Sequence, residues 1–346
     1  MRRTIALLGA AATVVVGAGV LGACGSSAPA GPRVTVMTRN LDEGTDFGPL
    51  VHATSAGAFL SAAAATWQEV QASDIPGRAA AVAAEIVAAK PDLVSIEEAS
   101  IWRTGPLLKG PATTVVYDAL ASLQRALDDT GSGYRTVVVQ QEADLEGPSS
   151  LGYDIRVTDE DAILARSALS LSNVRSGHFS HVLTLTPVGV KETILRGWTS
   201  VDARIGGKSV HYVETHLESF DNAVQKAQAQ ELVAGPARSN LPVIVACDCN
   251  TGPRVTPTYG YLVGAGGLHD AWTATNSGAG LTWPLHKEDP YGASATPNQR
   301  IDLVLFKGGV SAVSARLVGT GPGDRTAAGL WPSDHAGVVA TLALTS

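Results

Sequence analysis

The amino-acid sequence predicts an α/β protein, a four-layered α/β sandwich in which two mixed β-sheets pack face to face with helices outside. Hydrophobic residues make up 45% of the 346 residues, which is ample for a large core. Strand-like segments such as 241–248 are almost continuously apolar, as expected for strands covered on both faces. Ala-rich helical segments occur between them and can cover the outer faces of the two sheets.

The first half of the chain mixes strands and helices. A strand is expected at 33–40, and Ala-rich helices follow at 56–70 and 77–90, the second ending before Pro91. After these come a buried strand, a helix and another strand, at 92–98, 117–131 and 134–141. Residues 143–160 are rich in charged and turn-forming residues and are expected to form a long loop.

The second half is mostly β, with one clear helix at 222–235. Gly206 and Gly207 indicate a hairpin turn. The other segments are expected as strands, many of them antiparallel, at 161–172, 197–205, 208–217, 241–248, 300–306, 310–318 and 335–344. No repeat and no second linker is evident, so residues 33–346 are expected to form one domain.

The N-terminus has the pattern of an export signal. Two arginines precede an apolar run that ends in Leu21-Gly22-Ala23-Cys24, which resembles the lipobox of bacterial lipoproteins. We therefore expect residues 1–23 to be a signal peptide and residues 24–32 to be a flexible tether lipidated at Cys24. The protein would then be an extracytoplasmic cell-membrane lipoprotein of a bacterium; ordinary secretion and a retained anchor are the alternatives.

The charge balance disfavours tight binding of long polynucleotides. The net charge is -7 at pH 7 and the sequence pI is about 5.6, whereas nucleic-acid binding requires clustered Lys and Arg. A nuclease is not excluded, because a bound divalent cation can dominate the charge of a site.

The stretch Cys247-Asp248-Cys249-Asn250 follows an apolar strand. It is compatible with a thiolate metal site, a redox pair, or a catalytic strand end in which the cysteines only pack. Two thiolates are too few for a structural zinc site, and redox pairs are usually spaced Cys-x-x-Cys. On a strand, Asp248 and Asn250 share one face and the cysteines the other. We expect two free thiols, because residues two apart on a strand lie near the upper limit of bridgeable separation.

Polar residues of a few types, Asp, Asn, Glu and His, stand at the ends of six predicted strands. They occur in "TRNLDEG", "SIEEAS", "VETHLES", "CDCNTG", "RIDLV" and "PSDHAG". The ordered set resembles the endonuclease/exonuclease/phosphatase superfamily, which includes deoxyribonucleases, inositol-polyphosphate phosphatases and bacterial sphingomyelinases. The resemblance covers roughly residues 33–346. Two departures are Cys247 and Cys249 around Asp248, where the family often has Gly and an aromatic residue, and Glu97, where it often has Gln.

The resemblance implies a metal-dependent phosphoester hydrolase. Phosphodiester hydrolysis needs a cation, an activated water and donors to the phosphate oxygens. The implied ligands of Mg²⁺ (or Mn²⁺ or Ca²⁺) are Glu98, Asn40 and Asp334; the implied catalytic residues are His216, Asp248, Asn250, Asp302 and His335. Asp248 would activate water, fixed by Asn250, while His335 with Asp302 would act as acid and base and His216 would donate to the phosphate.

The substrate and the class of protein stay open at this point. The expected partner is a phosphoester, either a phospholipid or a nucleic acid, besides the membrane reached through Cys24, and no obligate protein partner is evident. The alternatives are a secreted nuclease, a non-catalytic surface binding protein on the same fold, and a thiol-based redox or copper-handling lipoprotein. Asp270 is expected to cap a helix, Trp272 to pack in the core, and residues 280–293 to shape the mouth of the pocket.

Overall fold

The structure is a computed structural model that describes residues 31–276, 278–287 and 292–345. The predicted signal peptide and Cys24 lie outside the described residues. Within the described ranges, no helix is both long enough and apolar enough to cross a membrane.

The first sheet has eight strands and contains the N-terminal and C-terminal strands. The order is β17-β18-β1-β2-β6-β3-β4, and β5 also pairs with β6. Only β1 and β2 run parallel among these pairs. The strands are β1 (Arg33–Asn40), β2 (Leu93–Glu97), β3 (Ile101–Pro106), β4 (Thr114–Asp118), β5 (Tyr134–Pro148), β6 (Tyr153–Arg166), β17 (Val310–Val318) and β18 (Gly337–Leu344).

The second sheet has six strands in the order β13-β16-β12-β11-β10-β7. Its strands are β7 (Leu171–His178), β10 (Gly197–Ile205), β11 (Lys208–His216), β12 (Val243–Asp248), β13 (His269–Asp270) and β16 (Asp302–Lys307). The predicted turn at Gly206 and Gly207 is confirmed, since both have positive φ between β10 and β11. Two small two-stranded sheets are β8 (Leu183–Leu185) with β9 (Glu192–Ile194), and β14 (His286–Lys287) with β15 (Ala293–Ser294).

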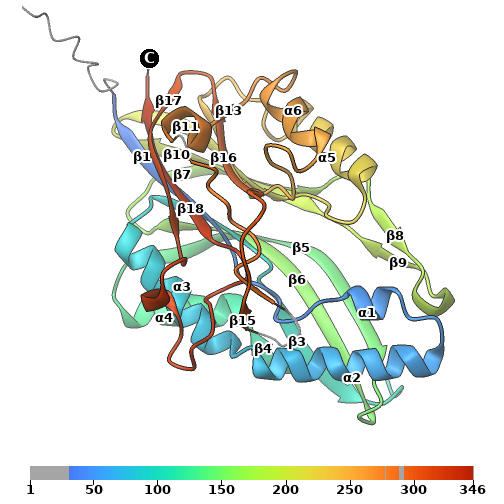
Figure 1. Cartoon of the computed structure of the whole chain (residues 1–346). Helices are drawn as coiled ribbons and strands as arrows, with labels where there is room; N and C mark the ends of the chain where they lie inside the picture. Colours follow the sequence, from blue (N-terminus) through green and yellow to red (C-terminus); the bar gives the residue numbers. More distant parts are fainter. Residues whose placement is uncertain (1–30, 277, 288–291, 346) are drawn as a thin grey trace, which may run out of the picture.

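The helices lie outside the two sheets (Figure 1). α2 (Ala56–Ala72), α3 (Ile75–Ala89) and α4 (Ala119–Asp129) cover the first sheet, while α5 (Asn222–Ala234) and α6 (Pro257–Val263) cover the second. The Ser55, Asp74, Asp118 and Asp221 side chains cap α2 to α5 by accepting backbone N–H bonds. The short helices are α1 (Gly48–Val51), α7 (Ala271–Thr275), η1 (Pro187–Gly189) and η2 (Pro322–Asp324).

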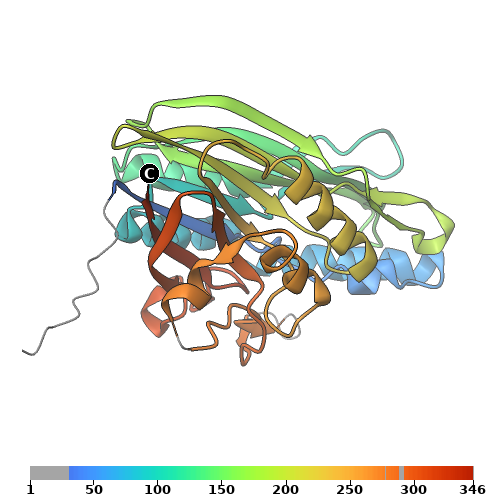
Figure 2. The same cartoon turned by 90° about the horizontal axis from the view of Figure 1, so that it is seen from above.

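Three apolar layers hold this arrangement together. Figure 2 shows the arrangement of the sheets and helices from above. The layer between the sheets is formed by alternate strand residues, among them Val34 and Val36 from β1 and Tyr212 and Ile244 from the second sheet. The other two layers lie beneath the helices. The four-layered sandwich predicted from the sequence is therefore confirmed.

The predicted loop at 143–160 is wrong. These residues form most of a long antiparallel hairpin of β5 and β6, in which Glu142, Asp159 and Asp161 are buried. The charged residues of 143–160 had suggested a solvated loop, whereas Asp154 and Asp159 among them are buried. The prediction for Asp270 is confirmed, because its carboxylate accepts the N–H groups of Trp272 and Thr273 at the start of α7. Trp272 is partly buried and packs against the layer between the sheets.

Strand direction and register bring the polar strand ends together. β1 runs parallel to β2, with Asn40 beside Glu97. β11 runs parallel to β12, with His216 beside Asp248, and Asp248 is also opposite Asp302 at the start of β16. One end of the sandwich therefore collects the residues described next.

Candidate active site

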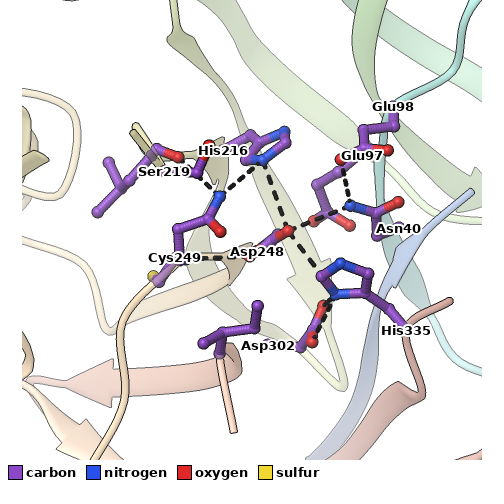
Figure 3. Close-up of polar contacts among 12 residues, drawn as sticks. Asn40, Glu97, Glu98, His216, Ser219, Asp248, Cys249, Asp302 and His335 are labelled. Atoms are coloured by element: carbon purple, nitrogen blue, oxygen red, sulfur yellow. Dashed lines mark hydrogen bonds and ion pairs between the residues drawn. The ribbon is translucent and has the colours of Figure 1, made fainter. Parts of the chain in front are cut away.

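The polar residues at this end of the sandwich converge on Asp248 (Figure 3). The Asp248 side chain is 1% exposed and contacts groups from both sheets. Its carboxylate lies 3.1 Å from Asn40 Nδ2, 3.5 Å from His216 Nε2 and 3.8 Å from His335 Nδ1. Further contacts join Glu98 to Asn40, Asn250 to His216, and both Asp302 and Asp334 to His335, so all eight predicted catalytic and metal-binding side chains lie in one connected cluster. Their roles stay predictions.

Asp302 and His335 form a buried pair. The Nδ1 atom of His335 lies 3.1 Å and 3.0 Å from the two carboxylate oxygens of Asp302. Burial disfavours the charged imidazolium, but Asp302, Asp334 and Asp248 outweigh it and raise the pKa of His335 well above its ordinary value. Arg39 donates to the main-chain oxygen of His335, which fixes the loop before β18. The ring is thus held in one orientation with a carboxylate behind it.

Glu98 lies where the chain leaves β2, with a positive φ of 55°. Its carboxylate accepts from Asn40 Nδ2 at 2.8 Å and from the N–H of Glu43 at 3.2 Å. Glu97, by contrast, is fully buried and accepts from the Thr38 hydroxyl at 2.6 Å. Of the two adjacent glutamates, Glu98 lines the cleft and Glu97 faces inward.

His216 is held by a buried arginine that sequence reasoning missed. Arg196 Nη1 lies 2.8 Å from His216 Nδ1 and 3.4 Å from Asp159 Oδ2. A guanidinium can only donate, so Nδ1 accepts this bond, while Nε2 faces both Asp248 and the side-chain amide nitrogen of Asn250. Burial, Arg196 and His335 hold the pKa of His216 well below its ordinary value.

Asn250 and Asp334 border the cluster. The main-chain N–H of Asn250 donates to Asp248 Oδ1 at 3.0 Å, and its side-chain Nδ2 lies 3.0 Å from His216 Nε2. Asp334 Oδ2 accepts from Trp283 Nε1 at 2.8 Å and lies 3.8 Å from His335 Nε2. Asp334 therefore lies on the His335 side of the cluster, with Trp283 as its hydrogen-bond donor.

The cluster is strongly acidic. Burial first, and then the carboxylates of Asp334 and Asp159, raise the pKa of Glu98 to about 8. Burial and Asp302 raise the pKa of Asp248 to about 6. Carboxylates crowded in this way disfavour one another's charge, and a bound cation would reverse that effect.

The donor set fits a hard divalent cation. Glu98, His216 and Asp248 place ligand atoms within 4.8 Å of one another, and so do Asp248, Asp302 and His335. Mg²⁺ takes oxygen ligands, typically one or two carboxylates together with water. Glu98 and Asp248 can supply those carboxylates.

A second set of acids lies in the layer between the sheets. Glu97, Glu142, Asp161 and Glu214 are all fully buried, and each has at least one oxygen without a hydrogen-bond partner. Burial raises the pKa of every one of them well above its ordinary value. No sequence signal separates these acids from solvated ones, because their burial depends on the pairing of the two sheets.

The prediction of two free thiols is wrong. Cys247 and Cys249 form a disulfide, and their Cα atoms are 5.1 Å apart. The prediction assumed that both residues belong to an extended strand, but β12 ends at Asp248 and the chain turns at Asn250, where φ is 47°. Both cysteines are fully buried and face away from the site, as expected for packing residues.

Other residues near the site were also missed. Glu43 and Asp159 line the cleft beside Glu98 and Arg196. His286 is buried, with Nε2 3.0 Å from Asp42 Oδ2. Its neighbours at 288–291, within the segment expected to shape the pocket mouth, lie outside the described residues, whereas Trp283 of that segment does line the cleft.

The fold and the site define a class of protein: two mixed sheets between helices, with an acidic, His-containing cluster where the strands end. The chain belongs to the Endonuclease/Exonuclease/phosphatase family, whose model matches residues 67–335. No curated protein matches the sequence.

Solved structures share the fold at low sequence identity. An endonuclease/exonuclease/phosphatase from Beutenbergia cavernae is 21% identical with a TM-score of 0.55, covering 91% of this chain and 72% of that chain. Truncated Caenorhabditis elegans TDP2 is 20% identical with a TM-score of 0.51, covering 90% and 97%. D. rerio TDP2 complexed with single-strand DNA product is 14% identical with a TM-score of 0.52, covering 90% and 98%. The family and the fold are consistent with metal-dependent phosphoester hydrolysis.

Proposed function

We propose that the chain is a divalent-metal-dependent phosphodiesterase. The observation that carries the proposal is the convergence of the buried Asp302–His335 pair and Asp248 with the Glu98–Asn40 pair at one end of a cleft. A binding protein needs neither an oriented His–Asp pair nor a carboxylate beside it, and burying these charges costs stability.

Each residue of the cluster has its own role in the proposed reaction. Asp248, fixed by the N–H of Asn250, takes a proton from water as the water oxygen bonds to phosphorus. The bond from phosphorus to the leaving oxygen breaks, and that oxygen takes a proton from His335, whose imidazolium Asp302 stabilises. His216 donates to a phosphate oxygen as negative charge develops. Each proton then has a donor and an acceptor within one cluster.

A divalent cation completes the site in this proposal. Glu98 would be its main ligand, with the Asn40 side chain beside it and Asp334 or Asp248 as a further oxygen donor. Bound there, Mg²⁺ neutralises charge on the phosphate.

The test is hydrolysis of a phosphodiester panel by the mature domain with Mg²⁺ and with excess chelator. The panel contains bis-p-nitrophenyl phosphate, sphingomyelin, phosphatidylinositides, DNA and RNA. His335→Gln should lower turnover by about 10²-fold or more, while His269→Gln, an exposed histidine outside the cleft, serves as the matched control. Equal activity of these two variants, or no metal-dependent turnover of any diester, would show the proposal to be wrong.

Two alternatives remain outcomes of this test. Preferential cleavage of DNA or RNA would make the protein a nuclease, an alternative motivated by the TDP2 structure solved with a DNA product. Binding of a phosphoester without turnover would indicate a non-catalytic surface binding protein. We further propose that the enzyme acts at the bacterial cell membrane, attached through a lipidated Cys24, on the strength of Leu21-Gly22-Ala23-Cys24.

A further inference from the structure

The catalytic cluster occupies one end of a cleft that is far larger than a phosphodiester group requires. The cleft has a volume of about 1090 Å³. Pockets for drug-sized ligands are typically about 300–1,000 Å³. The lining comes from α1 and α2, the β3–β4 turn, β5 and the β8–β9 hairpin, and Figure 1 shows α1, α2 and this hairpin extending to the same side of the sandwich. The cleft therefore has room for a large part of a substrate beyond the phosphate.

The walls away from the catalytic cluster are mainly apolar, although Glu146 on β5 and Glu192 on β9 also line them. They are formed by side chains from separate elements, including Phe47, Leu50, Phe59, Leu60, Leu145 and Ile194. Large apolar side chains also stand exposed at the border of the cleft: Leu108 is 76% exposed, Phe220 59% and Val190 55%. Apolar surface left in water around one cleft, rather than scattered singly, indicates a binding site for an apolar group.

The charges of the lining restrict the substrate further. Arg196 is the only Lys or Arg among the described lining residues, and it is engaged by Asp159 and His216. Acidic side chains such as Glu43, Glu146 and Glu192 line the cleft as well. Nucleic-acid binding depends on Lys and Arg contacts to successive phosphates. This cleft suits one phosphodiester held by a metal ion and disfavours a chain of them.

We infer that the cleft binds an amphiphile carrying a single phosphodiester and a long apolar chain, with the phosphate beside Asp248 and His335 and the chain between α1–α2 and the β8–β9 hairpin. This inference names the substrate class and rests on the proposed function for the reaction itself. The inference requires the alkyl chain of the substrate to bind inside the cleft, because the apolar side chains lie on the walls away from the catalytic cluster.

The first test is a series of alkyl p-nitrophenyl phosphodiesters with chains of increasing length, each kept below its aggregation concentration. Burial of one methylene contributes about 0.8 kcal/mol, so kcat/KM should rise about fourfold per buried methylene. Val190→Glu and Leu60→Glu, on opposite walls, should reduce the ratio of kcat/KM for long chains to that for short chains. Val174→Glu is the matched control, because Val174 is also an exposed valine but lies on β7, outside the cleft.

The second test needs no turnover. Calorimetric titration with Mg²⁺ present should show dodecyl phosphate binding far more tightly than ethyl phosphate, with the difference reduced by Val190→Glu and kept by Val174→Glu. Equal affinities, a flat chain-length series, or more efficient hydrolysis of DNA than of any alkyl diester would overturn the inference and leave the phosphodiesterase proposal standing. Chain-dependent binding without hydrolysis would support the cleft assignment and contradict the phosphodiesterase proposal.

Discussion

Replacing both cysteines of the Cys247–Cys249 disulfide by Ala should leave the protein folded. The bridge closes a ring of only three residues, for which the chain-entropy relation gives about 1.6 kcal/mol of stability. Both side chains are fully buried, so loss of the two sulfurs adds about 1 kcal/mol each for the cavities left behind. A total near 4 kcal/mol lies below the usual stability of a domain, about 5–15 kcal/mol.

Loss of the disulfide should also slow catalysis, because Asp248 lies between the two cysteines. Asp248 lies inside the ring, but hydrogen bonds also hold this segment: Leu217 N–H donates to the Asp248 main-chain oxygen at 3.1 Å, and Cys249 N–H donates to the Ile301 oxygen at 3.0 Å. These bonds limit the displacement of the carboxylate, although a 1 Å error can cost about 10²-fold in rate. We therefore expect kcat to fall by about tenfold to 10²-fold with KM little changed, less than the loss caused by Asp248→Asn.

The assay combines thiol titration with kinetics on a Cys24→Ser background. Denatured, unreduced protein should show no free thiol, and reduction should add two hydrogens to the intact mass. Urea denaturation of the double Ala variant should give a cooperative transition at a lower midpoint. Two free thiols in the native protein would refute the disulfide, and unchanged kcat in the double variant would refute its positioning role.

Four further predictions address the metal, the His–Asp pair, the buried acids and the membrane anchor. Glu98→Gln should lower Mg²⁺-activated turnover by about 10²-fold or more with little change in Tm. Unchanged rates at low and at saturating Mg²⁺ would show that Glu98 is not a metal ligand. Asp302→Asn removes the carboxylate that raises the pKa of His335, so the alkaline limb of the pH profile of kcat/KM should move to lower pH; an unmoved limb would contradict the pairing. Burial raises the pKa of Glu142 above its ordinary 4.5, so the folded protein loses stability as the pH rises above 4.5. Glu142→Gln should therefore increase the free energy of unfolding on the order of 1–3 kcal/mol at pH 8 and less at pH 4.5. Equal increases at the two pH values would contradict the raised pKa. Cys24→Ser should move the protein from the membrane fraction to the soluble fraction, and intact-mass data showing an uncleaved leader would contradict lipidation.

Local sequence patterns were sufficient to predict most of the elements. The Ala-rich helices α2 and α3 and the apolar strand β12 each follow from periodicity and end signals. The polar residues at the predicted strand ends lie together because parallel strands place equivalent ends side by side, as β11 and β12 do with His216 and Asp248. The helices and strands depend on residues close together in the sequence, and the grouping of the strand ends depends on strand direction. A single sequence carries information on both.

The rest depends on contacts between distant segments. Asp159 on β6 lies in the segment that was predicted as a loop, because charged residues are rarely buried, yet its side chain is buried in the folded protein. Arg196 precedes β10 like an ordinary surface arginine, and only the packing of β11 beside β10 places it on His216. The apolar cleft likewise joins helices and a hairpin more than a hundred residues apart.

The two sets of acids affect a phosphate substrate differently. Glu97, Glu142 and Glu214 have pKa values raised chiefly by burial, so in their neutral form they place little negative charge near an anionic phosphodiester. Glu98 and Asp248 face the cleft, and their raised pKa values bring their titration close to neutral pH. A divalent cation binds the charged carboxylates and releases their protons. If Glu98 and Asp248 hold the cation as proposed, metal binding and proton release are coupled at these two residues, and the acid limb of activity should depend on the Mg²⁺ concentration.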